Sequence, residues 1–542
     1  MSLFYLTNST KKINSVVDRI EKIFERRPSV GELTDDHKII FFEDKVYRKN
    51  IRNGQIYAFG LFFNERGFLG EALEQVECHE SLEKTLKEGL FGHYVFVVVT
   101  DGRINIVADK IGMLNVFYYQ NAENLCVSTD LQLIGESMPG IKPSPQGVKE
   151  FIFNETTIGS RTVFENVKRL RFGKAISIAN NSVLEGKYYN YVFENLSFEE
   201  YVHRVEKYFT LLNKYDGRMT TDLSGGFDTR LVSAVAHKAI RKIEANSNSN
   251  QFDRGVDDFL SPIVARKLKL KLTKLKNKDA CDDRQKMLHY FSIGRDVIRS
   301  RLWPSRLETK YKLFDMSLGG YGGETIRAKY NDLSTDDLYS SSVVFKVLND
   351  QEYRVLVNAE LNESYDFQMP LQWANFVYTV DRMRVWGGAQ VYANFLYGQI
   401  LHPFMDWHLI NPIFSFDAET LKGGGFQKEL IRTFAPQVDN VPINSKDRVR
   451  YKIDLIKKWL NEKIRKSNSL YAVAKRIKMS SSNDEAERKK IYAQYPRIKI
   501  DTVLFEKIGI KLSDVEERGR PDVLSRLITI NEAFSHFDKE EK

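Results

Sequence analysis

Residues 222–230 read Asp222-Leu223-Ser224-Gly225-Gly226-Phe227-Asp228-Thr229-Arg230, and the organisation of the chain follows from this segment. The residues ahead of it, 215–221, are polar and turn-prone, whereas those behind it begin an apolar helical face. A Ser-Gly-Gly turn that opens a helix presents backbone N–H groups and the positive end of the helix dipole to an anion. Glycines let phosphate oxygens approach the main chain, and Asp228 is suited to holding a magnesium ion that the phosphates share. The segment predicts a phosphate-binding loop, with an ordinary glycine-rich helix cap as the alternative.

A second glycine-rich segment carries an acidic residue of its own. It reads Phe314-Asp315-Met316-Ser317-Leu318-Gly319-Gly320-Tyr321-Gly322-Gly323-Glu324. Alone, it would be interpreted as a glycine-rich left-handed turn. A divalent ion on pyrophosphate needs acidic ligands beside close-approaching backbone, and two glycine loops with one acid each supply both. The pair therefore predicts a pyrophosphate and magnesium site with Asp228 and Glu324 as metal ligands.

Length and composition narrow the class of protein. A chain of 542 residues accommodates two to four domains, and 42% hydrophobic with 28% charged residues is typical of a soluble globular protein. The net charge is +9, the basic residues are spread along the chain, and the sequence has no motif that combines aromatic and basic residues. These features disfavour a nucleic-acid-binding protein. The three cysteines, Cys78, Cys126 and Cys281, have no metal-ligand spacing. Without a signal peptide or a run of about 18 apolar residues, we expect a cytoplasmic protein that neither enters nor crosses a membrane.

The string Leu-Ser-Gly-Gly-x-Asp-Thr at residues 223–229 resembles the pyrophosphate loop of the asparagine synthetase family, in which ATP is cleaved to AMP and pyrophosphate. It is not a Walker loop, because no Gly-Lys-Ser/Thr follows. The second segment resembles the family's Ser-Gly-x-Gly-x-Asp motif, with Glu324 in place of the aspartate. Its Gly-Tyr-Gly form is closer to the β-lactam synthetase branch. The resemblance implies that these residues hold the nucleotide: Leu223, Ser224, Gly225, Gly226, Asp228, Thr229, Gly320, Gly322 and Gly323.

Residues 1–192 are predicted to form an α+β layered domain. Runs of β-branched and aromatic residues indicate strands at 38–42, 55–63 and 94–99. Thr100-Asp101-Gly102-Arg103 indicates a hairpin turn, and helices are expected near 14–26 and 80–88. The order of Gly92–Phe96, Asp109–Gly112 and Phe117–Tyr119 resembles the class II glutamine amidotransferase (glutaminase) domain that precedes the synthetase in the same family. That resemblance implies an Ntn-type αββα fold.

The glutaminase activity itself is expected to be lost. The family's nucleophile is a cysteine directly after the initiator methionine, whereas this chain has Ser2. A serine hydroxyl with only its own α-amine as base is a poor substitute for a thiolate. Asn53-Gly54-Gln55-Ile56-Tyr57 resembles a glutamine-binding motif. The domain is then a structural platform, and β-lactam synthetases and lasso-peptide cyclases provide family precedents for loss of the cysteine.

Residues 193–542 are predicted to form the synthetase domain. A helix through 201–212, the first glycine loop, a strand within 240–250 and a helix at 263–270 favour a doubly wound parallel α/β fold of the ATP-pyrophosphatase type. The lysine-rich segment 267–278 is interpreted as a helix end and an edge strand rather than a nucleic-acid surface. From about residue 453 the pattern indicates added amphipathic helices, which would help to keep water away from a reactive adenylate.

Three residues are candidates for catalysis. Lys446 is the candidate for the family's charge-stabilising lysine, with Arg448, Arg450, Lys452 and a solvated surface role as alternatives. Arg230 is a second candidate cation. Gln399-Ile400-Leu401-His402-Pro403-Phe404-Met405-Asp406 resembles the family's Glu-Ala-Arg-Val-Pro-Phe-Leu-Asp segment, with Gln399 in place of the glutamate. The resemblance implies that Tyr321 corresponds to the loop tyrosine that pairs with this glutamate in the β-lactam-forming branch. A Tyr321–Gln399 pair would orient a substrate without deprotonating it.

Together, the motifs imply an ATP-dependent ligase that forms an amide bond. A substrate carboxylate would attack the α-phosphate to give an acyl-adenylate and pyrophosphate, and an amine or ammonia would then displace AMP. The expected cofactors are ATP and Mg²⁺, the expected substrates are a small-molecule or peptide carboxylate and an amine or ammonia donor, and the expected assembly is either a homodimer or a complex with a pathway partner protein. Two alternatives remain open: a glutamine-hydrolysing asparagine synthetase, which Ser2 disfavours, and a non-catalytic nucleotide-binding homologue, which Glu324 and Gln399 suggest.

Overall fold

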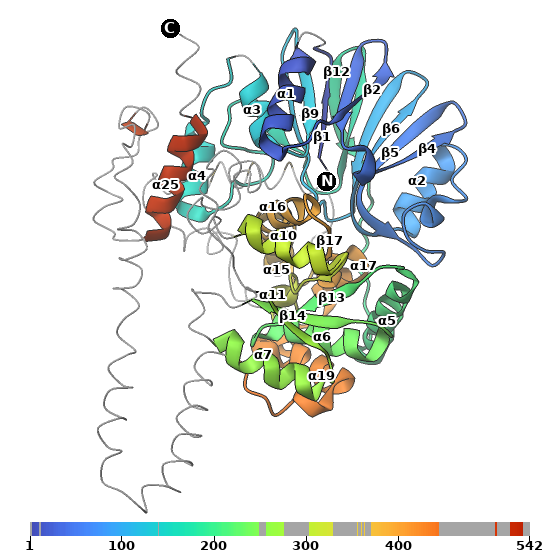
Figure 1. The fold of residues 1–542 in the computed structure, drawn as a ribbon, viewed down its shortest axis with the longest axis vertical. Helices are drawn as coiled ribbons and strands as arrows, with labels where there is room; N and C mark the ends of the chain where they lie inside the picture. Colours follow the sequence, from blue (N-terminus) through green and yellow to red (C-terminus); the bar gives the residue numbers. More distant parts are fainter. Residues whose placement is uncertain are drawn as a thin grey trace, which may run out of the picture.

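The computed structural model describes residues 3–9, 12–138, 140–248, 256–275, 303–328, 370–443 and 521–534, together with 355, 359, 363, 505 and 506. The described chain is a mixed α/β structure with two antiparallel sheets in its N-terminal half and one parallel sheet in its C-terminal half. Figure 1 shows the antiparallel strands in blue to cyan above the parallel-sheet half in green to orange. Lys446 and Ser2 lie outside the described residues.

The N-terminal half contains two six-stranded sheets. The first has the order β10-β8-β9-β1-β3-β2 and the second β12-β11-β7-β6-β5-β4. The strands of the first are β1 (Phe4–Thr7), β2 (Ser29–Thr34), β3 (His37–Phe41), β8 (Phe117–Gln120), β9 (Leu125–Ser128) and β10 (Val167–Arg169). Those of the second are β4 (Val46–Ile51), β5 (Gly54–Phe63), β6 (Phe91–Thr100), β7 (Arg103–Ala108), β11 (Lys174–Ala179) and β12 (Ser182–Lys187). The predicted strands at 38–42, 55–63 and 94–99 are confirmed as β3, β5 and β6.

Side-chain alternation along the strands packs the two sheets into layers. The ring of Phe4 on β1 lies 5.0 Å from that of Phe59 on β5, so these faces meet. On the other face of β1, the Tyr5 hydroxyl is 2.6 Å from Ser137 Oγ of α3 (Leu131–Ser137). Along β6, Val95 and Val97 belong to the main core, whereas alternate residues pack with α2 (His79–Glu88). This period of two lets both faces of the strand be buried.

Helices and turns complete this half as the sequence indicates. Helix α1 (Ile13–Phe24) buries one apolar face in the main core, which confirms the helix expected near 14–26. The turn between β6 and β7 is the expected two-residue hairpin, with Asp101 and Gly102 at φ values of 49° and 73°. Positive φ at both central residues matches the twist of the paired strands. Helix α4 (Pro145–Asn154) begins at a Ser144 side-chain cap.

The C-terminal half is built on a five-stranded parallel sheet. Its order is β15-β14-β13-β16-β17, with β13 (Met219–Asp222), β14 (Glu244–Asn248), β15 (Leu272–Leu275), β16 (Met316–Leu318) and β17 (Gln399–Leu401). Its helices include α5 (Phe198–Leu211), α6 (Phe227–Ala239), α7 (Val256–Lys267) and α10 (Trp303–Leu313). The chain runs outward through β14 and β15 and then returns to the other side of β13. In the described part of the lysine-rich segment, residues 267–275, the expected helix end and edge strand are confirmed as the end of α7 and β15.

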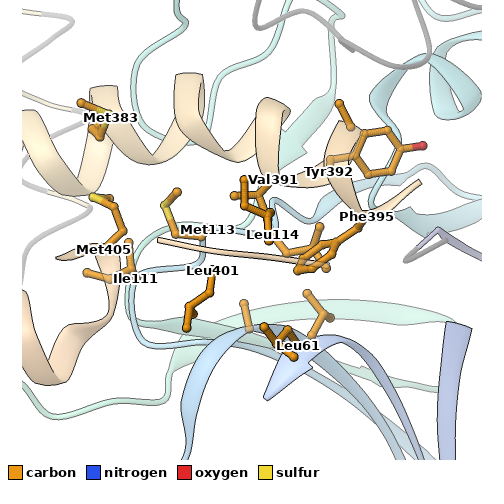
Figure 2. Close-up of a cluster of buried hydrophobic side chains, with 14 of the residues drawn as sticks. Leu61, Ile111, Met113, Leu114, Met383, Val391, Tyr392, Phe395, Leu401 and Met405 are labelled. Atoms are coloured by element: carbon orange, nitrogen blue, oxygen red, sulfur yellow. The ribbon is translucent and has the colours of Figure 1, made fainter. Parts of the chain in front are cut away.

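One continuous hydrophobic core joins the two halves. Figure 2 shows this junction, where Leu61, Ile111, Met113 and Leu114 from the first half approach Met383, Val391, Tyr392, Phe395, Leu401 and Met405 from the second. Buried polar contacts also cross it, including Gly159 N–H to Asp381 Oδ1 at 2.8 Å and Tyr392 hydroxyl to Asp130 Oδ2 at 2.7 Å. The predicted boundary at 192/193 falls between the end of β12 and the start of α5.

The C-terminal helix α25 (Pro521–Phe534) packs against α4 of the N-terminal half, as Figure 1 shows in red. Arg526 donates to the Ile152 carbonyl and to Glu155 Oε1, and the Phe534 ring lies 5.1 Å from that of Phe164. Helix α25 thus packs on the N-terminal half through α4 and Phe164, and the expectation that the C-terminal helices help to keep water from the nucleotide stays a prediction. The remaining residues beyond 453 lie outside the described ranges, apart from 505 and 506. None of the helices in the described ranges has the length and hydropathy that a bilayer crossing requires.

Candidate functional site

The two glycine loops leave neighbouring strands of the parallel sheet. The first follows Asp222 at the end of β13, and the second follows Leu318 at the end of β16. These strands are paired directly, with Thr221 opposite Leu318. The crossovers from β13 and β16 run to opposite sides, so this is the point where the strand order reverses. In open α/β sheets, ligands bind at that reversal, beyond the carboxyl ends of the strands.

The first loop holds its shape through its own hydroxyl groups. Ser224 N–H donates to Thr229 Oγ1 at 3.0 Å, and Ser224 Oγ lies 2.8 Å from the same oxygen. Gly226 N–H donates to Ser224 Oγ at 3.0 Å. Leu223 is buried and anchors the loop to β14 through a 2.7 Å bond from its N–H to the Asn246 carbonyl. The N-cap residue of helix α6 is Gly226, which has no side chain to cap the helix.

The glycines of the second loop are required by close contact with the first. A Cβ on Gly320 would lie 2.8 Å from Thr229 N, and one on Gly323 would lie 2.3 Å from Asp228 Oδ1. Gly322 has φ of 92°, and a Cβ there would lie 2.0 Å from the Phe404 carbonyl oxygen. No larger residue fits these positions without moving the backbone. The loops predicted from sequence to act together are thus brought together.

Asp228 and Glu324, the predicted metal ligands, converge on one cation. Arg327 Nη2 lies 3.2 Å from Asp228 Oδ2 and 4.0 Å from Glu324 Oε1. Gln427 donates to Asp228 Oδ1 at 3.2 Å, and the Tyr378 hydroxyl donates to Glu324 Oε2. No group of three or more His, Cys, Asp or Glu side chains suited to a metal occurs among the described residues. Because Mg²⁺ is commonly held by one or two carboxylates plus phosphate oxygens, this pair fits such a site if Arg327 yields its place.

Two cations flank the start of α6. The guanidinium of Arg327 lies 5.6 Å from the centre of the Phe227 ring, and Lys428 Nζ lies 5.8 Å from it. Lys428 and Gln427 belong to α19 (Gly425–Phe434), which packs on α6. Sequence reasoning missed all three residues together with Tyr378. The spacing of Arg327 three residues after Glu324 is the one local signal that pointed to any of them.

Arg230 is completely buried and donates to three carbonyl oxygens. Its partners are Val441 at 2.6 Å, Pro442 at 2.8 Å and Gly225 at 3.2 Å. The side chain therefore ties the first loop to the segment that leads toward Lys446. This geometry supports a positioning role for Arg230 rather than direct contact with a substrate.

Asp222 anchors a polar network at the carboxyl end of the central strand. Its Oδ1 accepts from Lys310 Nζ at 2.8 Å, from Asn246 Nδ2 at 2.9 Å and from Ser317 Oγ at 2.9 Å. Burial opposes the charge on Asp222, but Lys310 and the two hydrogen bonds outweigh it and hold the pKa of Asp222 below its usual 3.8. Burial also lowers the pKa of Lys310. The carboxylate–ammonium form is the one these donors favour.

Tyr321 stacks on a histidine that the sequence did not indicate. Its ring lies 4.3 Å from that of His402 at an angle of 21°, and 5.2 Å from Trp386. Burial lowers the pKa of His402 to about 4, so the imidazole is neutral at pH 7. The amide oxygen of Gln399 is buried without a hydrogen-bond partner in the described part of the chain. The hydrogen bond that a Tyr321–Gln399 pair would make through this oxygen is therefore absent.

Three buried polar atoms near the loops also lack partners among the described residues. They are Asn246 Oδ1, His402 Nε2 and Gln427 Oε1. Buried polar groups are usually satisfied by protein, water or ligand. Their residues contact Asp222, the second loop and Asp228, respectively. The carboxyl end of the sheet thus retains hydrogen-bonding capacity for a polar ligand.

A separate polar cavity of about 330 Å³ lies at the junction of the two halves. Two buried carboxylates, Asp109 and Asp406, line it together with Lys110 and His408. Burial raises the pKa of Asp109 to about 7 and that of Asp406 to about 6, although backbone N–H groups donate to both. Asp406 accepts from Gly92 N–H at 2.7 Å, which joins the halves.

The Asn53–Gly54 motif has a structural explanation. Asn53 adopts a φ of 62° at the turn between β4 and β5, and a Cβ on Gly54 would lie 2.0 Å from the Val99 carbonyl oxygen. Asn tolerates positive φ better than most residues, and Gly54, the first residue of β5, is required by its close approach to β6. The hairpin accounts for this pair of residues without a bound glutamine.

Comparison with known proteins gives little. No protein-family model and no curated protein sequence matches the chain. Among solved structures, glutamine phosphoribosylpyrophosphate (PRPP) amidotransferase from B. subtilis, complexed with ADP and GMP, matches with 7% identity and a TM-score of 0.24, over 41% of this chain and 60% of that chain. A structure described as the allosteric regulatory enzyme of purine biosynthesis matches with 8% identity, the same TM-score and the same coverage. The chain thus spans 60% of the length of each, and likeness at this level carries no functional argument.

Proposed function

We propose that the protein is an ATP-dependent carbon–nitrogen ligase of the asparagine synthetase type, which releases AMP and pyrophosphate. The observation that carries the proposal is the convergence of the two glycine loops at the strand reversal, with Asp228 and Glu324 contacting the same guanidinium. The strand order is that of a doubly wound sheet, which supports an ATP-pyrophosphatase type of domain.

The proposed chemistry has two displacements. A carboxylate oxygen of the substrate bonds to the α-phosphorus of ATP, and the bond from that phosphorus to the bridging oxygen breaks, so that pyrophosphate leaves with the electron pair. An amine nitrogen then bonds to the acyl carbon, AMP leaves with the electron pair of the C–O bond, and the nitrogen loses one proton. The net reaction consumes ATP, carboxylate and amine, and yields amide, AMP and pyrophosphate.

The chain's main contribution is to offset negative charge. An anionic carboxylate must approach a negatively charged polyphosphate, and the two repel each other. Positive groups that the protein holds in place before the reaction reduce this repulsion. The uncapped first turn of α6 and the ammonium of Lys428 offer such groups beside the first loop. A magnesium ion held by Asp228 and Glu324 would supply further charge neutralisation on the phosphates.

For the N-terminal half we propose an Ntn-type αββα domain that does not hydrolyse glutamine. Its two stacked antiparallel sheets with helices packed on them support that layering, and the serine at position 2 supports the loss of glutaminase activity. The nitrogen would then reach the synthetase half as free ammonia or as an amine. Glutamine hydrolysis by the purified protein would contradict this part of the proposal.

The test is formation of AMP and pyrophosphate from ATP with Mg²⁺, ammonium and a panel of carboxylates. We expect at least one carboxylate to support it, and we expect Asp228→Asn to slow pyrophosphate exchange by about tenfold or more, since charged hydrogen-bonding contacts are each worth roughly 1.5–3 kcal/mol. Asp439→Asn is the matched control, because Asp439 is exposed and pairs with Arg432 at the far end of α19. The ligase proposal fails if no AMP forms with any carboxylate and Asp228→Asn leaves ATP binding unchanged.

A non-catalytic nucleotide-binding protein is the second candidate. The observation that favours it is the pairing of both acids with Arg327, which already compensates part of their charge. The same experiment separates the two, because this candidate predicts ATP binding that depends on Asp228 without production of pyrophosphate.

A further inference from the structure

Arg327 contacts residues of the first turn of α6 and of the second glycine loop. Its Nη2 reaches Asp228 at the start of α6 and Glu324 in the second loop. Its Nε donates to the Gly323 carbonyl at 3.4 Å, and its guanidinium lies over the Phe227 ring. About a quarter of the side chain (25%) remains exposed. The residue is thus held at the edge of both loops, where solvent or a ligand can still reach it.

The positive charge of Arg327 has two competing uses. In the nucleotide-free protein it offsets two carboxylates, which would otherwise face each other across the loops. A polyphosphate beside the start of α6 offers a stronger partner, because a guanidinium forms two parallel hydrogen bonds with phosphate oxygens. The stacking on Phe227 and the bond to Gly323 do not depend on either carboxylate, so they keep the guanidinium near α6 when its acidic partners change.

We propose that Arg327 exchanges Asp228 and Glu324 for phosphate oxygens when the nucleotide binds, and that it is a catalytic residue that stabilises the departing pyrophosphate. The inference rests on the proposed function. In the empty site, Arg327 neutralises the negative charge of Asp228 and Glu324. In the filled site, it neutralises the negative charge of the leaving pyrophosphate. A divalent ion between the two carboxylates supplies the positive charge that Arg327 gives up there.

The exchange predicts that Arg327→Met changes the affinities for a divalent ion and for ATP in opposite directions. Arg327→Met removes the charge but keeps an apolar stem beside Phe227. Without the guanidinium, Asp228 and Glu324 lose a competitor for divalent ions, so the nucleotide-free protein binds Mn²⁺ more tightly. The phosphates lose a charged partner, so ATP binds about tenfold or more weakly, as expected for a charge-assisted bidentate contact. A permanent counter-ion predicts only the first effect, and a purely structural role predicts that both affinities fall.

The experiment measures both affinities on the full chain. Mn²⁺ binding to the nucleotide-free protein is followed by electron paramagnetic resonance, and ATP binding is followed by calorimetric titration with and without Mg²⁺. Arg327→Lys keeps the charge without the fork and should recover part of the ATP affinity. Arg432→Met is the matched control, because Arg432 also pairs with two acids but lies on the exposed surface of α19. Thermal unfolding of each variant checks that it is folded.

The outcomes are distinct. Tighter Mn²⁺ binding with weaker ATP binding in Arg327→Met supports the exchange. Unchanged ATP affinity, or weaker binding of both ligands, overturns the exchange while leaving the proposed function in place, since the wild type still binds ATP. Failure of the wild type itself to bind ATP overturns the proposed function and the inference together.

Discussion

Gly323 lies so close to Asp228 that any side chain at this position would collide with the carboxylate, since a Cβ would be 2.3 Å from Oδ1. The contact links the second glycine loop to the first turn of α6. It means that the orientation of the predicted metal ligand depends on a residue nearly a hundred positions later in the chain. The absence of a side chain at Gly323 is therefore a property of the site.

Gly323→Ala is expected to displace Asp228 or to separate the loops. Overpacking of this kind costs about 1–3 kcal/mol, so the free energy of unfolding should fall by that amount, and ATP binding should weaken by about tenfold. Urea denaturation and calorimetric titration measure the two effects. Gly425→Ala is the control, because the nearest atom to its Cβ would be 3.8 Å away. Normal ATP affinity in Gly323→Ala would show that this contact does not position Asp228.

Arg230→Lys is expected to destabilise the first loop although the charge is kept. Lysine has no planar fork, so it cannot bond the carbonyls of Gly225, Val441 and Pro442 together as Arg230 does. We expect the free energy of unfolding to fall by about 1–3 kcal/mol, because at least one buried carbonyl loses its donor. The affinity for ATP should fall with it. A stable variant with unchanged ATP affinity would contradict the positioning role.

Asp222→Asn is expected to leave Lys310 buried without a counter-charge. Breaking a buried ion pair from one side costs about 3–5 kcal/mol. Because the folded-state pKa of Asp222 is depressed, its contribution is fully present above the unfolded-chain value of 3.8 and is lost as the pH falls through the folded value. The difference in unfolding free energy between wild type and variant, from urea denaturation, should therefore be constant near neutral pH and shrink below pH 3.8.

The double variant Asp222→Asn, Lys310→Met provides the control for this pair. Replacing both partners with neutral groups is often far less costly than removing one. We expect it to recover most of the stability lost in Asp222→Asn. A double variant as unstable as the single one would show that the network, and not the unpaired lysine, sets the cost.

Asp406→Asn is expected to change the pH dependence of stability in the direction opposite to that of Asp222→Asn. The folded-state pKa of Asp406 is raised from 3.8 to about 6, so ionisation is penalised only in the folded protein, and the penalty grows from pH 3.8 to about 6 and is constant above. The variant removes this penalty, which is on the order of 1–3 kcal/mol at 1.36 kcal/mol per pKa unit. Its amide also faces donors, which adds an offset that does not vary with pH.

The measurement for Asp406 is the difference between variant and wild-type unfolding free energies at several pH values. The titration of Asp109, which lines the same cavity, does not cancel in this difference, because the charge on Asp406 helps to raise the pKa of Asp109. Removing that charge lowers the pKa of Asp109 in the variant, which adds to the same trend. The difference should move in favour of the variant between pH 4 and 6. A difference that is flat over this range would mean that the carboxylate titrates at its ordinary pKa.

Much of the fold can be predicted because the signals are local. The apolar run at 94–99 and the Asp101–Gly102 turn specify a strand and a hairpin by residue type alone. The alternation of lysine and apolar residues near 267–278 likewise indicates an edge strand. The docking of α25 on α4 cannot be read in this way, because an amphipathic face specifies that a helix is buried but not what covers it.

The glycine loops and their acids can be predicted, whereas the cations around them cannot. Asp228 lies in a recognisable motif, but Lys428 and Tyr378 come from segments that only the folded chain brings near. Arg230 looked like a cation for the phosphates, yet two residues of helix separate it from Asp228 by about 200°, which turns it to the opposite side of α6. Its burial follows from helix geometry that a motif comparison does not consider.

The most direct test of the central claim is the binding of ATP, in the presence of Mg²⁺, to the wild type and to Asp228→Asn by calorimetric titration, with Asp439→Asn as control. If the two glycine loops form a phosphate site, the wild type and the control bind one ATP per chain with equal affinity, and Asp228→Asn binds about tenfold or more weakly. No ATP binding by the wild type, or equal affinity in all three proteins, would contradict the claim.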